Sequence, residues 1–160
     1  MLNIDKELES VLNQYGEEIR LAISSRLKAD NKVATGKAAN SLIKKATPNS
    51  LKIEGWKYIE VISGGREAGK KAPPIGKIIQ WLDAKRGMTI RSDYYKTRPH
   101  RRGSLAYIIA RNIGKRGIKG NNMLTDIKNK FVPQLDDSIA DVIQKEIIRI
   151  TEQTNNKTSK

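Results

Sequence analysis

Helical periodicity at the two ends of the chain constrains its fold more than any other feature. Near the N-terminus, apolar side chains recur every three or four positions, at Ile4, Leu8, Val11, Leu12, Tyr15, Ile19, Ala22, Ile23 and Leu27. A second stripe with the same spacing follows Pro133, at Leu135, Ile139, Val142, Ile143, Ile147 and Ile150. This spacing places apolar side chains on one face of an α-helix. We therefore expect one helix over residues 2–27 and another from Pro133 to about Thr151.

The segment between these helices contains shorter patterns. Leu51 and Ile53 alternate with polar neighbours, and residues 58–62 are rich in β-branched and aromatic side chains, so both runs predict strands. Pro48-Asn49-Ser50 is a turn signal before the first run. Pro74 suits the first turn of a helix over residues 75–82, with Gly87 as its stop.

Another short helix is expected over residues 105–113, because Ser104 can cap it and its apolar residues have helical spacing. Together these segments predict an α+β fold: a long N-terminal helix, a small antiparallel sheet, and two or three further helices packed on it. The length of 160 residues fits one domain, expected over residues 1–152. A long basic loop is expected at 88–103, and a disordered polar C-terminal tail at 153–160.

Positive charge is concentrated in the middle third of the chain. Residues 61–120 contain 15 Lys or Arg and 3 Asp or Glu, a net charge of +12. Residues 1–60 have a net charge of +2, and residues 121–160 have a net charge of zero. A localised surplus of this kind indicates a polyanion near the region. A solubilising patch or a surface that faces a protein partner is the alternative explanation.

Several functional classes have no support in the composition. The chain has no cysteine, which excludes disulfides and thiolate sites, and its one histidine, His100, does not suffice for a triad or a multi-histidine metal site. No apolar run approaches the roughly 20 residues of a membrane span, and the acidic, amphipathic N-terminus does not have the pattern of a signal peptide. We expect no enzymatic activity, no cofactor, no metal and no small-molecule substrate.

Other candidate residues have ordinary structural explanations. Asp136, Asp137 and Asp141 fall in the first half of the last expected helix, where carboxylates complement the helix dipole. Trp81 is interpreted as a core anchor rather than a platform for base stacking. Tyr94 and Tyr95 lie among cations and can stack on bases or lie in a protein interface.

The stretch IGKRGIKG at residues 113–120 contains three glycines and three cations. It does not match a P-loop, because Gly114 and Gly120 are six residues apart and Gly120 is followed by Asn121. Two interpretations stay open. The stretch resembles the G-x-x-G loop with which KH domains clamp four nucleotides, or it ends a helix, with Gly114 or Gly117 in the left-handed conformation.

The candidate interaction surface, toward a neighbouring subunit or DNA, combines cations and tyrosines of the basic loop with the cations of the glycine stretch. Its residues are Arg91, Tyr94, Tyr95, Lys96, Arg98, Arg101, Arg102, Lys115, Arg116 and Lys119.

Four segments follow one another in a distinctive order: TGKAANSL at 35–42, WKYIEVISGG at 56–65, PPIGKIIQWLDAKRG at 73–87 and AYIIARNIGKRGIKGNNML at 106–124. Their order and spacing resemble the neck or tail-completion proteins of tailed bacteriophages, which join the head to the tail. The resemblance covers about residues 30–150.

This resemblance implies a non-enzymatic structural protein of the virion, found in the neck or tail and, during assembly, in the host cytoplasm. It implies a homo-oligomeric ring around the DNA channel, with portal or connector proteins and tail proteins as partners. Non-specific contact with packaged DNA is also implied, and no membrane is involved. The alternative is a small basic RNA- or DNA-binding domain that uses the KH-like G-x-x-G loop.

Overall fold

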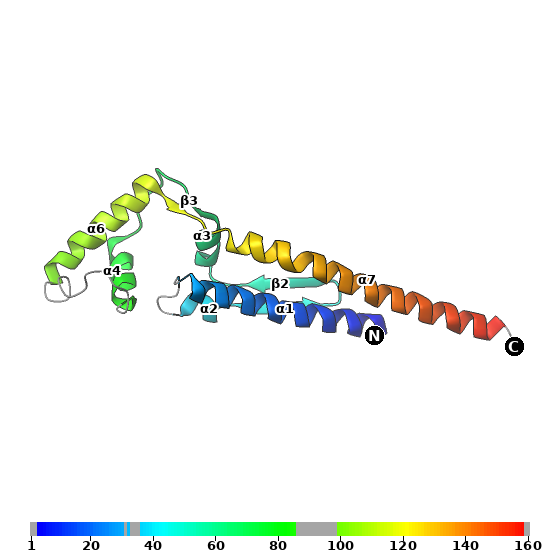
Figure 1. Cartoon of the computed structure of the whole chain (residues 1–160). Coiled ribbons are helices and arrows are strands. Elements are labelled where there is room, and N and C mark those ends of the chain that lie inside the picture. The colour runs from blue at the N-terminus through cyan, green and yellow to red at the C-terminus, as the bar shows by residue number, and fades with distance from the viewer. Residues whose placement is uncertain (1–2, 31, 33–35, 86–98, 159–160) are drawn as a thin grey trace. The chain divides into compact units, whose positions relative to one another are not determined.

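The computed structural model describes residues 3–30, 32, 36–85 and 99–158 (Figure 1). It is 72% helical, and two short antiparallel pairs of strands complete it, which confirms the predicted α+β class. The chain forms two compact units: unit 1 comprises residues 1–26, 41–55 and 123–160, and unit 2 comprises residues 27–40 and 56–122. Compactness does not by itself establish independent folding, so the single domain over residues 1–152 stays a prediction.

Unit 1 contains a hairpin and two long helices. Helix α1 (Asn3–Ala29) confirms the helix predicted from the N-terminal periodicity, and its last residues belong to unit 2. Strands β1 (Ile43–Thr47) and β2 (Ser50–Glu54) pair antiparallel, from Ile43 opposite Glu54 to Thr47 opposite Ser50. The predicted turn and the predicted strand around Leu51 are therefore confirmed. Helix α7 (Met123–Thr158) is the second long helix.

The hairpin and α7 both contact α1. The Nζ of Lys44 on β1 donates a hydrogen bond to the carbonyl oxygen of Asn13 at 2.9 Å. A Cβ added at Gly16 would lie 2.8 Å from a methyl carbon of Leu51, so β2 approaches α1 closely at that glycine. The hydroxyl of Tyr15 donates to the carbonyl oxygen of Gln134 at 3.0 Å and lies 2.9 Å from the hydroxyl of Ser138 on α7.

The bounds of α7 correct two expectations. Pro133 lies inside the helix instead of beginning it, because the ten preceding residues contain no glycine or proline and continue the helical pattern. The polar tail predicted at 153–160 is helical as far as Thr158. The hydroxyls of Thr151 and Thr154 donate to the carbonyls of Ile147 and Ile150, and no residue after Pro133 is one that breaks a helix.

Unit 2 contains the remaining elements. They are α2 (Lys37–Asn40), α3 (Tyr58–Gly64), β3 (Gly65–Arg66), α4 (Ile75–Ala84), α6 (Pro99–Arg116) and β4 (Ile118–Lys119). Helix α4 confirms the helix predicted after Pro74. Helix α3 shows that the strand predicted at 58–62 is wrong, because Ile59 and Ile62 are buried together on one helical face. Propensity for strands is easily overridden by packing of this kind.

Helices α4 and α6 pack against each other. Ile78, Ala106 and Ala110 are buried at their contact, and the partly buried Ile79, Leu82, Ile109 and Ile113 surround them. Small alanine side chains on α6 allow the two helices to approach closely.

Helix α6 also corrects the predicted basic loop. It begins at Pro99 rather than after Ser104, so residues 99–103 of that loop are helical. Proline is well suited to the first turn of a helix, because it has no backbone N–H to satisfy. Residues 88–98 of the expected loop, and the predicted stop at Gly87, lie outside the described residues.

Candidate functional site: the glycine turn and a basic aromatic pocket

The glycine stretch ends helix α6. The last helical residue is Arg116, and Gly117 follows in the left-handed conformation with φ of 71°. The backbone N–H of Gly117 donates to the carbonyl oxygen of Ile113 at 2.9 Å. This geometry confirms the predicted helix stop, with Gly117 as the left-handed residue.

The turn then packs directly on the backbone of residues 63–68. A Cβ added at Gly117 would collide with the carbonyl oxygen of Arg66 and would lie 2.9 Å from the nitrogen of Ala68. A Cβ at Gly120 would lie 2.6 Å from the carbonyl carbon of Gly64. Both glycines are therefore required by a close approach between two backbone segments.

Backbone hydrogen bonds hold this contact together. Strands β3 and β4 pair antiparallel, with Gly65 opposite Lys119. The N–H of Asn122 then donates to the carbonyl of Ser63 at 2.9 Å. The glycine stretch is thus fixed in place by protein rather than left open as a loop.

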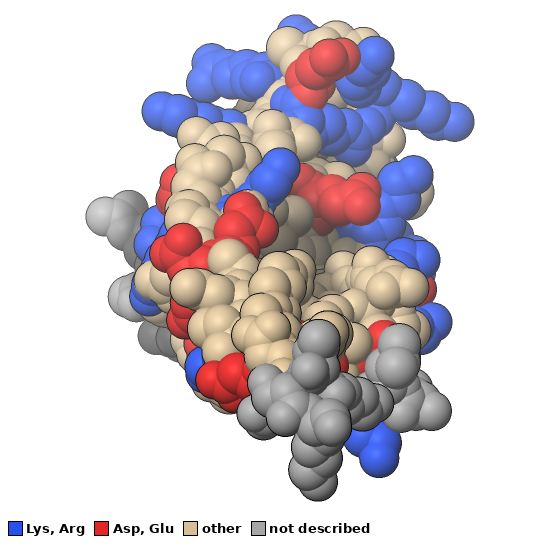
Figure 2. Space-filling view, turned by 90° about the vertical axis from the view of Figure 1, so that its right-hand side faces the viewer, with Lys and Arg blue, Asp and Glu red and all other residues tan. Residues whose placement is uncertain are grey.

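The cations of the turn point to solvent. Lys115 and Arg116 lie in the last turn of α6, and Lys119 lies on β4; all three side chains are exposed. Cations at this end of a helix also complement its dipole. Figure 2 shows Lys and Arg side chains projecting outward around the edges of the view, with Asp and Glu side chains among them.

The other predicted interaction residues fall outside this description. Residues Arg91, Tyr94, Tyr95, Lys96 and Arg98 lie outside the described part of the chain. Arg101 and Arg102 belong to the first turns of α6, and the structure describes their backbone alone.

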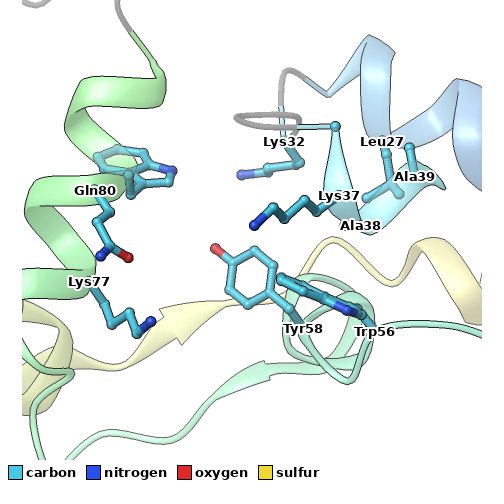
Figure 3. A pocket seen from close by; sticks show the side chains of 11 residues that line it. Leu27, Lys32, Lys37, Ala38, Ala39, Trp56, Tyr58, Lys77 and Gln80 are labelled. Atoms are coloured by element: carbon cyan, nitrogen blue, oxygen red, sulfur yellow. The ribbon is translucent and has the colours of Figure 1, made fainter. Parts of the chain in front are cut away.

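A pocket of about 250 Å³ opens in unit 2, and the sequence interpretation missed it. Its walls come from α4 on one side and from the end of α1, α2 and the start of α3 on the other (Figure 3). The lining residues are Leu27, Lys32, Gly36, Lys37, Ala38, Ala39, Trp56, Tyr58, Lys77, Gln80 and Trp81. We call this the basic aromatic pocket.

Three lysines bring positive charge to the pocket from separate segments. Lys32 follows the end of α1, Lys37 begins α2, and Lys77 lies on α4. Figure 3 shows the ends of all three side chains directed toward the same space, together with the Tyr58 hydroxyl. None of the described lining residues is acidic.

The aromatic residues of the pocket are unusually accessible. Trp56 is 53% exposed and Tyr58 is 48% exposed. Trp81, which the sequence interpretation placed in the core as an anchor, is only partly buried and lines the same pocket. Both tryptophans of the chain therefore contribute to one cavity.

A fourth lysine lies close enough to respond to this charge. Lys85, at the end of α4, is buried, and burial lowers the pKa of its ammonium group. The positive charge of Lys32 lowers that pKa further. The charges of Lys32 and Lys85 are therefore close enough to interact.

The three aspartates singled out in the sequence do not form a metal site with other described residues. Asp136, Asp137 and Asp141 are exposed on α7. Within the described ranges, no group of three or more His, Asp or Glu side chains is arranged to hold a metal ion. The helices described in the structure include none long and apolar enough to cross a membrane.

Comparisons with protein-family models, with curated proteins and with solved structures found no match to this chain.

Proposed function

We propose that this chain is a structural protein of a tailed bacteriophage virion. It assembles as a ring in the neck, as a head–tail connector or tail-completion protein, around the DNA channel. The order of the four sequence segments supports the family, and the excess positive charge of residues 61–120 suits a protein that surrounds DNA. The observation that carries the assembly is an exposed apolar stripe on α7.

The stripe consists of isoleucines on the C-terminal half of α7. Ile143, Ile147 and Ile150 are 42%, 59% and 53% exposed. They are separated by four and three residues, and Ala140 and Thr154 continue the alternation. This is the spacing of the a and d positions of a heptad repeat, through which helices pack together.

A second copy of the chain fits this stripe best. A heptad seam is self-complementary, because each side chain packs between those of a similar helix. Isoleucines exposed in a row are unusual in a chain with 30% charged residues, and such patches mark contacts with other proteins. Contacts between copies of one subunit type close into a ring when the rotation between neighbours closes.

The exposed cations complete the proposal. Phosphate contacts are independent of DNA sequence, so a channel requires positive charge but no specific site. Lys115, Arg116 and Lys119 are exposed in this way at the end of α6.

The KH-like alternative stays an untested prediction. A G-x-x-G loop must let a nucleic-acid backbone approach its glycines. Here Gly117 and Gly120 lie against the backbone of residues 63–68 instead. No observation on this turn favours that function, so it is not proposed.

Native mass spectrometry of the full-length chain, alone and with its connector partner, tests the assembly. We expect closed oligomers of uniform stoichiometry, and we expect Ile147→Lys to abolish them because it places a charge in the seam. The matched control is Glu152→Gln, which changes the net charge by the same amount at an exposed position on the side of α7 opposite the stripe. A chain that stays monomeric under every condition, or oligomers that tolerate Ile147→Lys, would contradict the proposal.

A further inference from the structure

We propose that the basic aromatic pocket binds one nucleotide unit, holding its phosphate and its base together. The juxtaposition that points to this ligand is three lysine side chains and three aromatic side chains around a single cavity in unit 2. The proposal requires neither a ring nor a neck, so it stands apart from the proposed function.

The charge of the pocket suits a phosphate. The side-chain ends of Lys32, Lys37 and Lys77 converge although they come from three different segments (Figure 3). Lysine binds phosphate as a compact point charge with three donors. A phosphate group in this space can accept hydrogen bonds from ammonium groups that come from separate segments.

Lys85, a buried lysine at the end of α4, interacts electrostatically with Lys32 of the pocket. The pKa of Lys85 is lowered by burial and then by the charge of Lys32. A phosphate near Lys32 offsets that charge and stabilises both ammonium groups.

The aromatic walls suit a base. Trp56 and Tyr58 are about half exposed, and Trp81 lines the cavity from α4. Aromatic side chains bind bases by stacking, and they tolerate any sequence because every base has a π-face. The amide of Gln80 points into the same space and can both donate and accept hydrogen bonds at a base edge (Figure 3).

The size of the cavity limits the ligand to one unit. Its volume of about 250 Å³ is slightly below that of typical small-molecule sites, which measure about 300–1,000 Å³. An acidic peptide matches the lysines but leaves the aromatic surfaces unused. A nucleotide uses both features, whether it is free or part of a single strand.

Tryptophan fluorescence provides a direct assay, because both tryptophans of the chain line the pocket. The full-length protein is titrated with deoxyadenosine monophosphate, single-stranded oligodeoxyadenylate, inorganic phosphate and an acidic peptide at matched ionic strength. We expect saturable quenching by the first two ligands. Tighter binding of the oligonucleotide assigns the site to a strand, and equal binding per site assigns it to free nucleotides.

Two variants test the two halves of the site. Tyr58→Ala should weaken nucleotide binding by about fivefold or more, the lower limit for loss of one stacking contact. Lys77→Gln should weaken binding and reduce its dependence on salt. Lys145→Gln is the matched control, since it removes the same charge from an exposed position on α7 and should change nothing. Circular dichroism checks that each variant is folded.

Three results would overturn the proposal. These are the absence of saturable quenching by either nucleotide ligand, tighter binding of the acidic peptide than of the nucleotides, and equal affinities for Lys77→Gln, Lys145→Gln and the unmodified chain. Inorganic phosphate that binds as tightly as the nucleotide would also overturn it, because the aromatic walls would then contribute nothing.

Discussion

Replacing Gly117 by alanine tests the structural role of the glycine turn. The φ of 71° is left-handed, which costs an alanine about 1–2 kcal/mol. The added Cβ would also collide with the carbonyl oxygen of Arg66 and lie 2.9 Å from the nitrogen of Ala68. Backbone shifts that relieve such overpacking cost about 1–3 kcal/mol more. The free energy of unfolding should therefore fall by about 2–5 kcal/mol.

Gly69 supplies the matched control. Its φ of 78° is also left-handed, but a Cβ added there meets nothing within 4 Å. Gly69→Ala should therefore show the conformational cost alone, about 1–2 kcal/mol. For a chain of this size, each kcal/mol lowers the midpoint of thermal unfolding by about 2–4 °C. Far-UV circular dichroism should thus record a drop of roughly 4–20 °C for Gly117→Ala and roughly 2–8 °C for Gly69→Ala.

The difference in unfolding midpoint between Gly117→Ala and Gly69→Ala tests whether the turn packs on the neighbouring backbone. Equal midpoints would show that Gly117 does not pack on the backbone of residues 63–68. A Gly117→Asp variant that unfolds like the original chain, yet loses nucleic-acid binding, would instead favour the KH-like alternative.

Two further predictions concern unit 1. Tyr15→Phe removes the hydroxyl that meets Gln134 and Ser138, so urea unfolding should show a loss of about 1 kcal/mol; an unchanged midpoint would mean that this contact contributes nothing. Two lysines of the hairpin lower the pKa of Glu54 from 4.5 to about 2 through hydrogen bonds. Because the folded pKa is depressed, the ionised carboxylate stabilises the fold above about pH 5, and this contribution is lost as pH falls toward 2. Stability curves of the original chain and Glu54→Gln should therefore converge over that range, and an NMR titration placing the Glu54 pKa near 4.5 would contradict the ion pairs.

Local patterns in the sequence predicted several elements correctly. The spacing of Leu8, Leu12 and Ile23 predicted α1, and Pro74 with the isoleucines after it predicted α4. The glycine stretch predicted the end of α6, with Gly114 or Gly117 as the left-handed residue, and the structure has Gly117 in that conformation. In each case the residues that determine the structure are close together in the chain.

Errors arose where packing decides between local alternatives. Residues 58–62 have strand propensity, but burial of Ile59 and Ile62 on one face makes them helical. Pro133 has the character of a helix start, yet α7 passes through it. A proline inside a helix costs about 3 kcal/mol, and the burial of Phe131 and Val142 on the same helix can offset that cost. Propensity alone does not contain these contributions.

The basic aromatic pocket could not be found from the sequence. Its lysines and aromatic residues are distributed from Lys32 to Trp81, and no local spacing connects them. The sequence interpretation placed Trp81 in the core as an anchor, whereas Trp81 is partly buried and lines the pocket. Only the positions of α2 and α4 in unit 2 bring these residues together.

Imaging the intact particle of the phage proposed to encode this chain tests the proposed function most directly. At a resolution that places individual helices, the account predicts a closed ring of identical copies at the junction of head and tail. It also predicts that the isoleucine stripe of α7 is covered by a neighbouring copy and that exposed cations face the DNA channel. Particles without this chain, or a chain located away from the neck and tail, would contradict the account.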